Sequence, residues 1–194
     1  MDGWESKRRR DGGNDWAIIE LGSPGIITEI DVDTSFFTGN FPPFASIEGL
    51  YSDKKPSKDS DWIEILPKTS LKGDSCNKFK IESKTKVNYI KLQIFPDGGV
   101  ARLRLFGEVK LNWENYGNKN YLIELSSLKL GGSIVAYNNA HYGDVSALLS
   151  HGRGKTMGDG WETRRRREPG NDWIIIKLAT RGLIKKIEIY IIFI

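Results

Sequence analysis

The sequence predicts an all-β fold, a β-sandwich or jelly roll, from short alternating runs, turn residues between them, and little helical periodicity. Residues 89–95 and 101–105 both alternate apolar and polar side chains, and Pro96-Asp97-Gly98-Gly99 between them predicts a hairpin. Further strands are expected at residues 16–21, 26–32, 62–66 and 79–82. Only residues 145–149 indicate a helical turn, and residues 52–60, rich in Lys, Asp and Ser, indicate an exposed loop.

One segment of the chain occurs twice. Residues 2–37 align without a gap on residues 159–194, an offset of 157, with 18 identities in 36 positions. Unrelated segments of this length share about two identities, so the segment has been duplicated. The offset is the length of a whole domain rather than that of a solenoid repeat.

Two full copies would need more than the 194 residues of the chain, so we expect both repeats to be incomplete. The first repeat is predicted at residues 1–110 and lacks its N-terminal strands. A linker is predicted at residues 111–125. The second repeat is predicted at residues 126–194 and lacks its C-terminal part.

Composition excludes several classes of protein. Hydrophobic residues make up 39% and charged residues 28%, as in soluble globular domains. The net charge of +4 is small, and the Arg runs are interleaved with acidic residues, so we expect no nucleic-acid partner. The most apolar stretch, residues 183–194, is too short and too charged to span a membrane. A lone cysteine, Cys76, and no visible signal peptide predict a reducing compartment, namely the cytoplasm.

The duplicated segment mixes Arg residues with carboxylates. The candidates are Glu5, Arg8, Arg9, Arg10 and Asp15 in the first copy and Glu162, Arg165, Arg166, Arg167 and Asp172 in the second. Guanidinium groups bind carboxylates in bidentate geometry, so the Arg residues are candidate substrate-binding groups. The acidic residues are candidate catalytic groups, because they orient N–H groups or move protons. A solvated loop with structural ion pairs is the alternative, and duplication does not exclude it.

Other candidates carry weaker signals. Four tryptophans bracket the charged segments and either line a pocket or anchor the core: Trp4, Trp16, Trp161 and Trp173. His141 lies in a Gly- and Asn-rich loop and is a candidate acid–base catalyst, with a structural role as the alternative. His141, Asp144 and His151 have no convincing metal-ligand spacing, so we expect no metal and no cofactor.

The charged segment resembles the repeats of the allantoicase family. The first repeat is matched by residues 1–6, 14–16 and 31–40, and its closing turn by residues 96–104. The second repeat is matched by residues 151–155 and 157–166. Several separate motifs therefore occur in the family's order, and they extend over nearly the whole chain.

The resemblance implies two galactose-binding-like jelly rolls, and hydrolysis of allantoate to ureidoglycolate and urea in allantoin (purine) catabolism. Allantoate has one carboxylate and two ureido groups, so Arg side chains could hold the carboxylate. A carboxylate or His141 could protonate the departing urea and activate water. The implied partner is this small molecule; a homo-oligomer and a peroxisomal location are left open.

The alternative is a non-catalytic galactose-binding-like module or an inactive allantoicase fragment. Residues 31–36 of the first copy include the polar stretch Asp33-Thr34-Ser35, whereas the aligned part of residues 188–193 is an apolar run. The missing strands would also leave open sheet edges. The duplicated charged motif favours the enzyme, and the missing segments favour the module.

Overall fold

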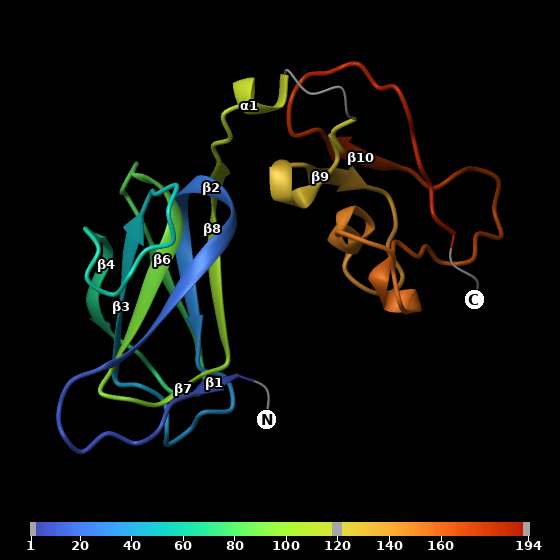
Figure 1. Ribbon diagram of the computed structural model, residues 1–194. Coiled ribbons are helices and arrows are strands. Elements are labelled where there is room, and N and C mark those ends of the chain that lie inside the picture. The colour runs from blue at the N-terminus through green and yellow to red at the C-terminus, as the bar shows by residue number, and fades with distance from the viewer. Residues whose placement is uncertain (1–2, 118–121, 192–194) are drawn as a thin grey trace. The chain divides into compact units, whose positions relative to one another are not determined.

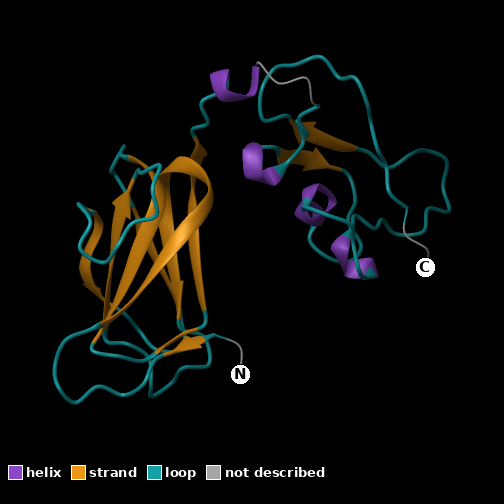
Figure 2. Cartoon of the chain, in the orientation of Figure 1, coloured by secondary structure: helices purple, strands orange, loops and turns teal. Residues whose placement is uncertain are grey.

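The computed structural model describes residues 3–117 and 122–191 and has two compact units, Met1–Leu111 (unit 1) and Asn112–Ile194 (unit 2). Most of the regular structure is β-strand (Figures 1 and 2), which confirms the predicted all-β class. No helix in the described part of the chain is long and apolar enough to cross a membrane. The expected linker, residues 111–125, holds a one-turn helix, α1 (Glu114–Gly117), and its residues 118–121 lie outside the described ranges.

Unit 1 is a β-sandwich. Its strands are β1 (Trp4–Glu5), β2 (Asp15–Asp33), β3 (Phe44–Leu50), β4 (Ile63–Ser70), β5 (Cys76–Lys80), β6 (Lys86–Phe95), β7 (Gly99–Val100) and β8 (Arg102–Val109). The main sheet has the order β4-β3-β6-β2-β5, and β8 pairs with β2 as well. The short strands β1 and β7 pair with each other at one end of the unit (Figure 1).

Strand β2 belongs to both layers of the sandwich. The sequence predicted two strands, residues 16–21 and 26–32, but the structure has one strand of 19 residues. A register shift between Glu20 and Gly25 bends it instead of ending it. Before the shift β2 pairs with β6; after it, β6 and then β5 pair with one edge of β2, and β8 pairs with the other. Gly25 permits the close approach of β8, because a Cβ there would lie 2.6 Å from the carbonyl oxygen of Glu108.

The predicted hairpin of residues 89–95 and 101–105 is wrong, although both strands exist. Strand β6 pairs with β3 and β2, while β8 pairs with β2 and with no other strand in the described ranges. Both β6 and β8 pair with Gly25 and Ile26, so they lie on opposite edges of β2. The turn at residues 96–101 therefore crosses between the layers, and β7 within it pairs with β1.

Strand β3 was not predicted. Only Ala45 and Ile47 mark its buried face in the sequence, and both are fully buried between β4 and β6. Gly49, which sequence rules treat as a strand breaker, fits here because a Cβ would lie 2.7 Å from the Val87 side chain. Cys76 is the exposed first residue of β5.

The core of unit 1 lies between the layers. It consists of Ile27, Ile30, Val32, Ala45, Ile47, Ile65, Leu66, Leu71, Val87, Ile90, Leu92, Ile94 and Val100. Ile30 and Val32 of β2 and Ile90 of β6 have no exposed surface. Burial of these side chains is the main source of stability, at about 25 cal/mol per Å² of apolar surface removed from water.

The loop of residues 51–62 covers the side of β6 that faces away from the core. At its start, the Ser52 N–H donates to Asn88 Oδ1 (2.9 Å), and Asn88 Nδ2 donates to the Ser52 carbonyl (2.7 Å). At its end, the Trp62 ring lies 4.9 Å from Lys91 Nζ. Lys91 is only 8% exposed, so the predicted exposed loop is attached to the sheet at both ends.

Unit 2 has much less regular structure. Strand β9 (Ser133–Tyr137) pairs antiparallel with β10 (Ile174–Lys177). The described remainder includes single 3₁₀ turns at Leu128–Leu130, Val145–Leu149 and Met157–Asp159. The Val145–Leu149 turn confirms the one predicted there. Asp144 begins it, because its side chain accepts the N–H of Ser146.

We expect Ile90→Ala to lower the free energy of unfolding of unit 1 by about 3 kcal/mol, since it leaves a cavity at a fully buried site. Ile63→Ala is the control, because Ile63 is 49% exposed on the edge strand β4. Urea denaturation of both variants measures the difference. Equal losses would contradict the position assigned to the core.

Candidate functional site

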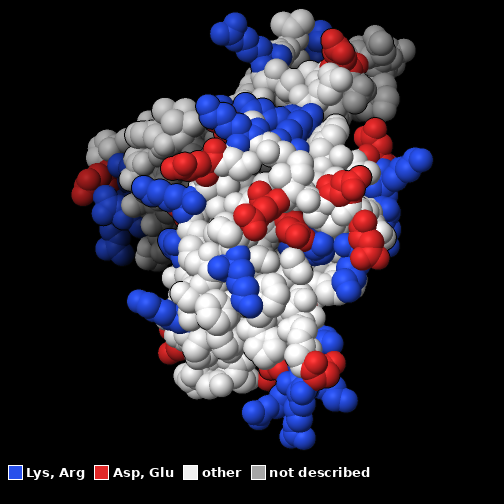
Figure 3. All heavy atoms as spheres, turned by 90° about the vertical axis from the view of Figure 1, so that its left-hand side faces the viewer, with Lys and Arg blue, Asp and Glu red and all other residues white. Residues whose placement is uncertain are grey.

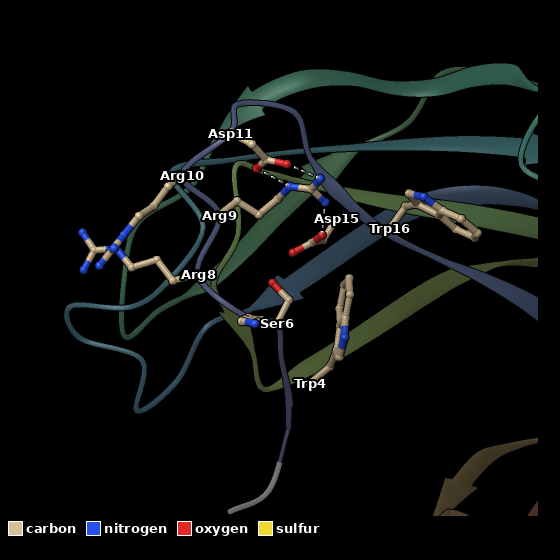
Figure 4. A pocket seen from close by; sticks show the side chains of 9 residues that line it. Trp4, Ser6, Arg8, Arg9, Arg10, Asp11, Asp15 and Trp16 are labelled. Atoms are coloured by element: carbon tan, nitrogen blue, oxygen red, sulfur yellow. Dashed lines mark hydrogen bonds and ion pairs between the residues drawn. The ribbon is translucent and has the colours of Figure 1, made fainter.

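A hollow at the β1–β7 end of unit 1 contains most of the first charged motif (Figure 4). The residues that line it are Trp4, Ser6, Lys7, Arg8, Arg9, Arg10, Asp11, Asp15 and Trp16. They belong to β1, to the first two residues of β2 and to the loop between these strands. Trp4 is partly buried against the core, so it has the anchoring role that was one of the two expectations. Trp16 is 40% exposed and lines the hollow, which was the other expectation.

The loop between β1 and β2 is held in place by the turn that precedes β7. The Ser6 N–H donates to the Gly98 carbonyl at 3.0 Å. The Arg9 N–H donates to Asp97 Oδ2 at 2.6 Å. These two bonds fix the backbone on which Arg9 stands, so the middle Arg of the triplet is the best positioned.

Arg9 points inward and forms an ion pair with Asp15. Arg9 Nη1 donates to Asp15 Oδ1 at 2.7 Å and to the Asn14 carbonyl at 3.2 Å. The other edge of the guanidinium is covered by Asp11, with Nε–Oδ1 at 3.3 Å and Nη2–Oδ2 at 3.2 Å. Arg9 therefore holds two carboxylates, one of them in the bidentate manner that a substrate carboxylate would use.

Both acids are kept ionised. A hydrogen bond from the Ser6 side chain, and then the bond from Arg9, hold the pKa of Asp15 below its ordinary value. The hydrogen bond from Arg9 lowers the pKa of Asp11 in the same way. Because a carboxylate of lowered pKa accepts hydrogen bonds and does not donate at neutral pH, the geometry favours Asp15 as the group that orients Arg9.

Unit 2 repeats this ion pair at the aligned positions. Arg166 Nη2 donates to Asp172 Oδ1 at 2.6 Å, and Asn138 Nδ2 donates to the same oxygen at 2.9 Å. The bond from Arg166, followed by one from Thr163, lowers the pKa of Asp172 to about 2. Thr163 aligns with Ser6, so the hydroxyl that stabilises the carboxylate is duplicated as well.

A glycine follows the Arg triplet in both copies for a steric reason. Gly13 has φ of 97° and Gly170 has φ of 133°, which side chains rarely adopt. A Cβ on Gly170 would also lie 3.1 Å from Nη1 of Arg166, and one on Gly13 would lie 3.7 Å from Nη2 of Arg9. The glycine lets the loop turn in both copies, and in unit 2 it also leaves room for the inward guanidinium.

The two copies differ at the second edge of the guanidinium. Asp11 covers this edge in unit 1, and the aligned residue in unit 2 is Glu168. Arg166 Nε is buried and has no hydrogen-bond partner among the described residues. Nη2 of the same edge donates to Asp172 Oδ1, so Nε is the donor of this edge that is left without an acceptor, which is costly for a buried group.

The flanking Arg residues of both triplets turn outward. Arg8 and Arg10 are exposed and turn away from the Arg9–Asp15 pair in Figure 4, and Arg165 and Arg167 are exposed in unit 2. Figure 3 shows one group of Lys and Arg side chains projecting at the lower end of the face drawn there, with others spread over the rest of it. The structure therefore separates each triplet into one paired Arg and two solvated ones.

The remaining candidates are not brought into either ion pair. Glu5 is exposed and accepts from Asn40 Nδ2 at 2.6 Å. In unit 2, the His141 N–H donates to the Glu162 carbonyl at 2.8 Å, so backbone pairing holds these two residues together. His141 is exposed. Within the described ranges, no three His, Cys, Asp or Glu side chains are grouped as metal ligands.

Sequence reasoning missed the groups that surround the ion pairs. Asp11, Ser6 and Thr163 lie inside the motif, and their alignment across the two copies was the available signal for the hydroxyls. Asn138 had no such signal, because it reaches Asp172 only through the pairing of β9 with β10. Gln93, which accepts from Asn14 Nδ2 at 3.1 Å, is likewise distant in sequence.

A family model described as the allantoicase repeat matches residues 1–110 and again residues 123–193. The chain belongs to the allantoicase family. The resemblance inferred from the sequence motifs is therefore confirmed.

Individual proteins agree with the family match. A probable allantoicase of Burkholderia mallei is 47% identical over 97% of this chain, and one of Rhizobium meliloti is 49% identical over 96%. These alignments cover 56% and 54% of the relatives, so the chain spans just over half of their length. The crystal structure of allantoicase from Saccharomyces cerevisiae has a TM-score of 0.77 and 37% identity, covering 92% of this chain and 57% of that one.

We expect Arg166→Ala to raise the pKa of Asp172 from about 2 toward the ordinary value, because the largest cause of its lowering is removed. A lowered pKa stabilises the fold above the unfolded pKa of ~3.9. The stabilisation is lost as the pH falls toward 2. Carbon-13 NMR titration of the carboxyl group measures the pKa, with the exposed Arg167→Ala as control. An unchanged pKa in Arg166→Ala would refute the ion pair.

Proposed function

We propose that this chain contributes to the hydrolysis of allantoate to ureidoglycolate and urea, the reaction implied by its family. The observation that carries the proposal is the duplicated Arg–Asp pair with an inward guanidinium edge. Allantoate presents one carboxylate, and a guanidinium held by a second carboxylate is preorganised to bind it. The alternative charged-loop role does not account for the buried, unpartnered Nε of Arg166.

The two copies are proposed to differ in substrate binding. In unit 1, Asp11 already occupies the bidentate edge of Arg9, at the position that a substrate carboxylate would need. In unit 2 the corresponding edge of Arg166 has an unpartnered Nε. We therefore assign the substrate carboxylate to Arg166, with Asp172 as the residue that orients it.

Proton transfer needs groups other than the paired acids. Asp15 and Asp172 are held ionised, so in this proposal they orient Arg residues and do not act as general acids. Glu162 and His141 lie together in unit 2 and stay candidates for activating water and protonating the departing urea. Glu5 is the equivalent of Glu162 in unit 1.

Urea release from allantoate tests the proposal in the purified chain and in a longer version with the flanking residues of its relatives. We expect Arg166→Ala to lower kcat/KM by about 100-fold, because the guanidinium charge and its hydrogen bond to the substrate carboxylate are lost. Arg166→Lys should not restore activity, since an ammonium lacks the planar fork. Arg9→Ala should have a much smaller effect.

Arg167→Ala is the matched control, since Arg167 is the exposed neighbour of Arg166. Its kcat/KM should stay within about twofold of the unmodified protein. No urea from either length of chain would defeat the enzyme assignment. Release from the longer version alone would make this chain an inactive part of the enzyme.

The second candidate function is a non-catalytic module that binds a small ligand. The observation that favours it is that Asp11 already occupies the edge of Arg9 that a substrate carboxylate would need. Calorimetric titration with allantoate separates the two functions, because a module would bind without releasing urea.

The further expectations follow from the same reaction. The proposed partner is allantoate, without nucleic acid or membrane, and with no cofactor or metal; a homo-oligomer is compatible with it. The proposed repeats are residues 1–110 and 126–194 with the linker 111–125. The proposed location is the cytoplasm, with the peroxisome as the alternative.

A further inference from the structure

Arg9 presents a complete fork to a carboxylate, and Asp11 occupies it. Nε donates to Asp11 Oδ1 at 3.3 Å and Nη2 donates to Asp11 Oδ2 at 3.2 Å. Two such parallel bonds are the geometry in which a guanidinium binds a carboxylate of a ligand. Nη1 lies outside this fork and donates to Asp15 and to the Asn14 carbonyl. The fork can therefore exchange Asp11 for another carboxylate while the pair with Asp15 stays intact.

The two carboxylates on Arg9 are held differently. Asp15 begins β2 and its side chain is 20% exposed, whereas the side chain of Asp11, in the loop, is 68% exposed. They reach the guanidinium from different sides (Figure 4). An ion pair with so exposed a carboxylate is screened by water and adds little to stability. Asp11 is thus the partner that can leave Arg9 at little cost.

The loop conformation that brings Asp11 onto Arg9 depends on glycine at position 12. Gly12 has φ of 70° and Gly13 has φ of 97°, so two successive residues lie in the left-handed region. A Cβ on Gly12 would meet no atom within 4 Å. The reason for glycine at this position is therefore the backbone conformation and not a lack of space.

Unit 2 has a different residue at the same place. Pro169 aligns with Gly12, and Glu168 aligns with Asp11. Proline holds φ near about −65°, so the conformation of Gly12 is closed to Pro169. Glu168 is exposed, and Arg166 Nε has no hydrogen-bond partner among the described residues. The residue after the acid therefore decides whether that acid lies on the guanidinium.

The hollow around Arg9 is basic apart from the two carboxylates bonded to it. Three further basic residues line it, Lys7, Arg8 and Arg10. When Asp11 leaves the fork, the basic side chains of the hollow favour its replacement by an anion. A planar carboxylate makes both bonds of the fork, whereas a spherical anion such as chloride does not.

We propose that the Nε–Nη2 edge of Arg9 is a carboxylate-binding site of unit 1 and that Asp11 is its built-in competitor. A small molecule with a free carboxylate binds by replacing Asp11, and Asp15 continues to orient Arg9. The site is separate from the one assigned to Arg166. Asp11 keeps it closed at low ligand concentration, because a tethered carboxylate has a high effective concentration.

The test is titration of the full chain, labelled with nitrogen-15, with sodium acetate at neutral pH and constant ionic strength. The Nε–H resonance of Arg9 reports binding. We expect Asp11→Asn to bind acetate about tenfold more tightly than the unmodified chain, because the competing charge is gone. Acetamide, which has the shape of acetate without its charge, should not shift the resonance.

Glu168→Asn is the matched control, because it makes the same change at the aligned, exposed position of unit 2. It should leave acetate binding at Arg9 unchanged.

Gly12→Pro tests the part played by the backbone. Proline should release Asp11 from the fork, so the affinity for acetate should rise about as much as in Asp11→Asn. The pKa of Asp11 should also return toward its ordinary value, because the bond from Arg9 is the largest cause of its lowering. The two changes act through one step, so the double variant should bind no more tightly than either single one.

Equal affinity of Asp11→Asn and the unmodified chain for acetate would overturn the proposal. So would an Arg9 resonance that shifts no more than that of the exposed Arg167. Allantoate added to the acetate complex of Asp11→Asn distinguishes the sources of the carboxylate. Displacement of acetate would identify the substrate as an occupant, and no displacement would identify another small acid. Because acetate binding is the readout, the outcome does not depend on urea release.

Discussion

The register shift between Glu20 and Gly25 turns β2 from one layer of the sandwich to the other, and the rest of unit 1 depends on that bend. Each layer is completed by a different part of the same strand. Because the buried residues Ile30 and Val32 anchor its second part, the first part is fixed relative to the core. Asp15 is the first residue of β2, so the packing of the sandwich fixes the position of its ion pair with Arg9.

The Arg–Asp pairs contribute more to geometry than to stability. Arg9 and Arg166 are each about a third exposed, and partly exposed ion pairs add little to the free energy of folding. Their value is that a flexible side chain is held in one orientation. Both copies keep the Arg–Asp pair, the hydroxyl residue beside the Asp, and the glycine after the Arg triplet. The second carboxylate differs, because Asp11 bonds to Arg9 in unit 1 and the aligned residue in unit 2 is Glu168.

The sequence was sufficient for elements that depend on local pattern and insufficient for those that depend on partners. Alternation located β6 and β8, but their pairing is decided by β2, which lies between them. The charged motif located the site, yet three consecutive Arg residues in a loop have no periodicity that says which one turns inward. That choice comes from the bond between the Arg9 N–H and Asp97, which is 88 residues away.

The loop of residues 51–62 is attached to β6 at both ends, so a break in its middle would not separate it from the sheet. Lys54, Lys55 and Lys58 are exposed, whereas Ser52 is bonded to Asn88 and Trp62 lies over Lys91. A protease that cut the backbone after Lys54 would leave both new ends tied to β6. The sandwich would then persist as two complementary fragments, and the same bond is a natural place to split the chain or to insert another domain.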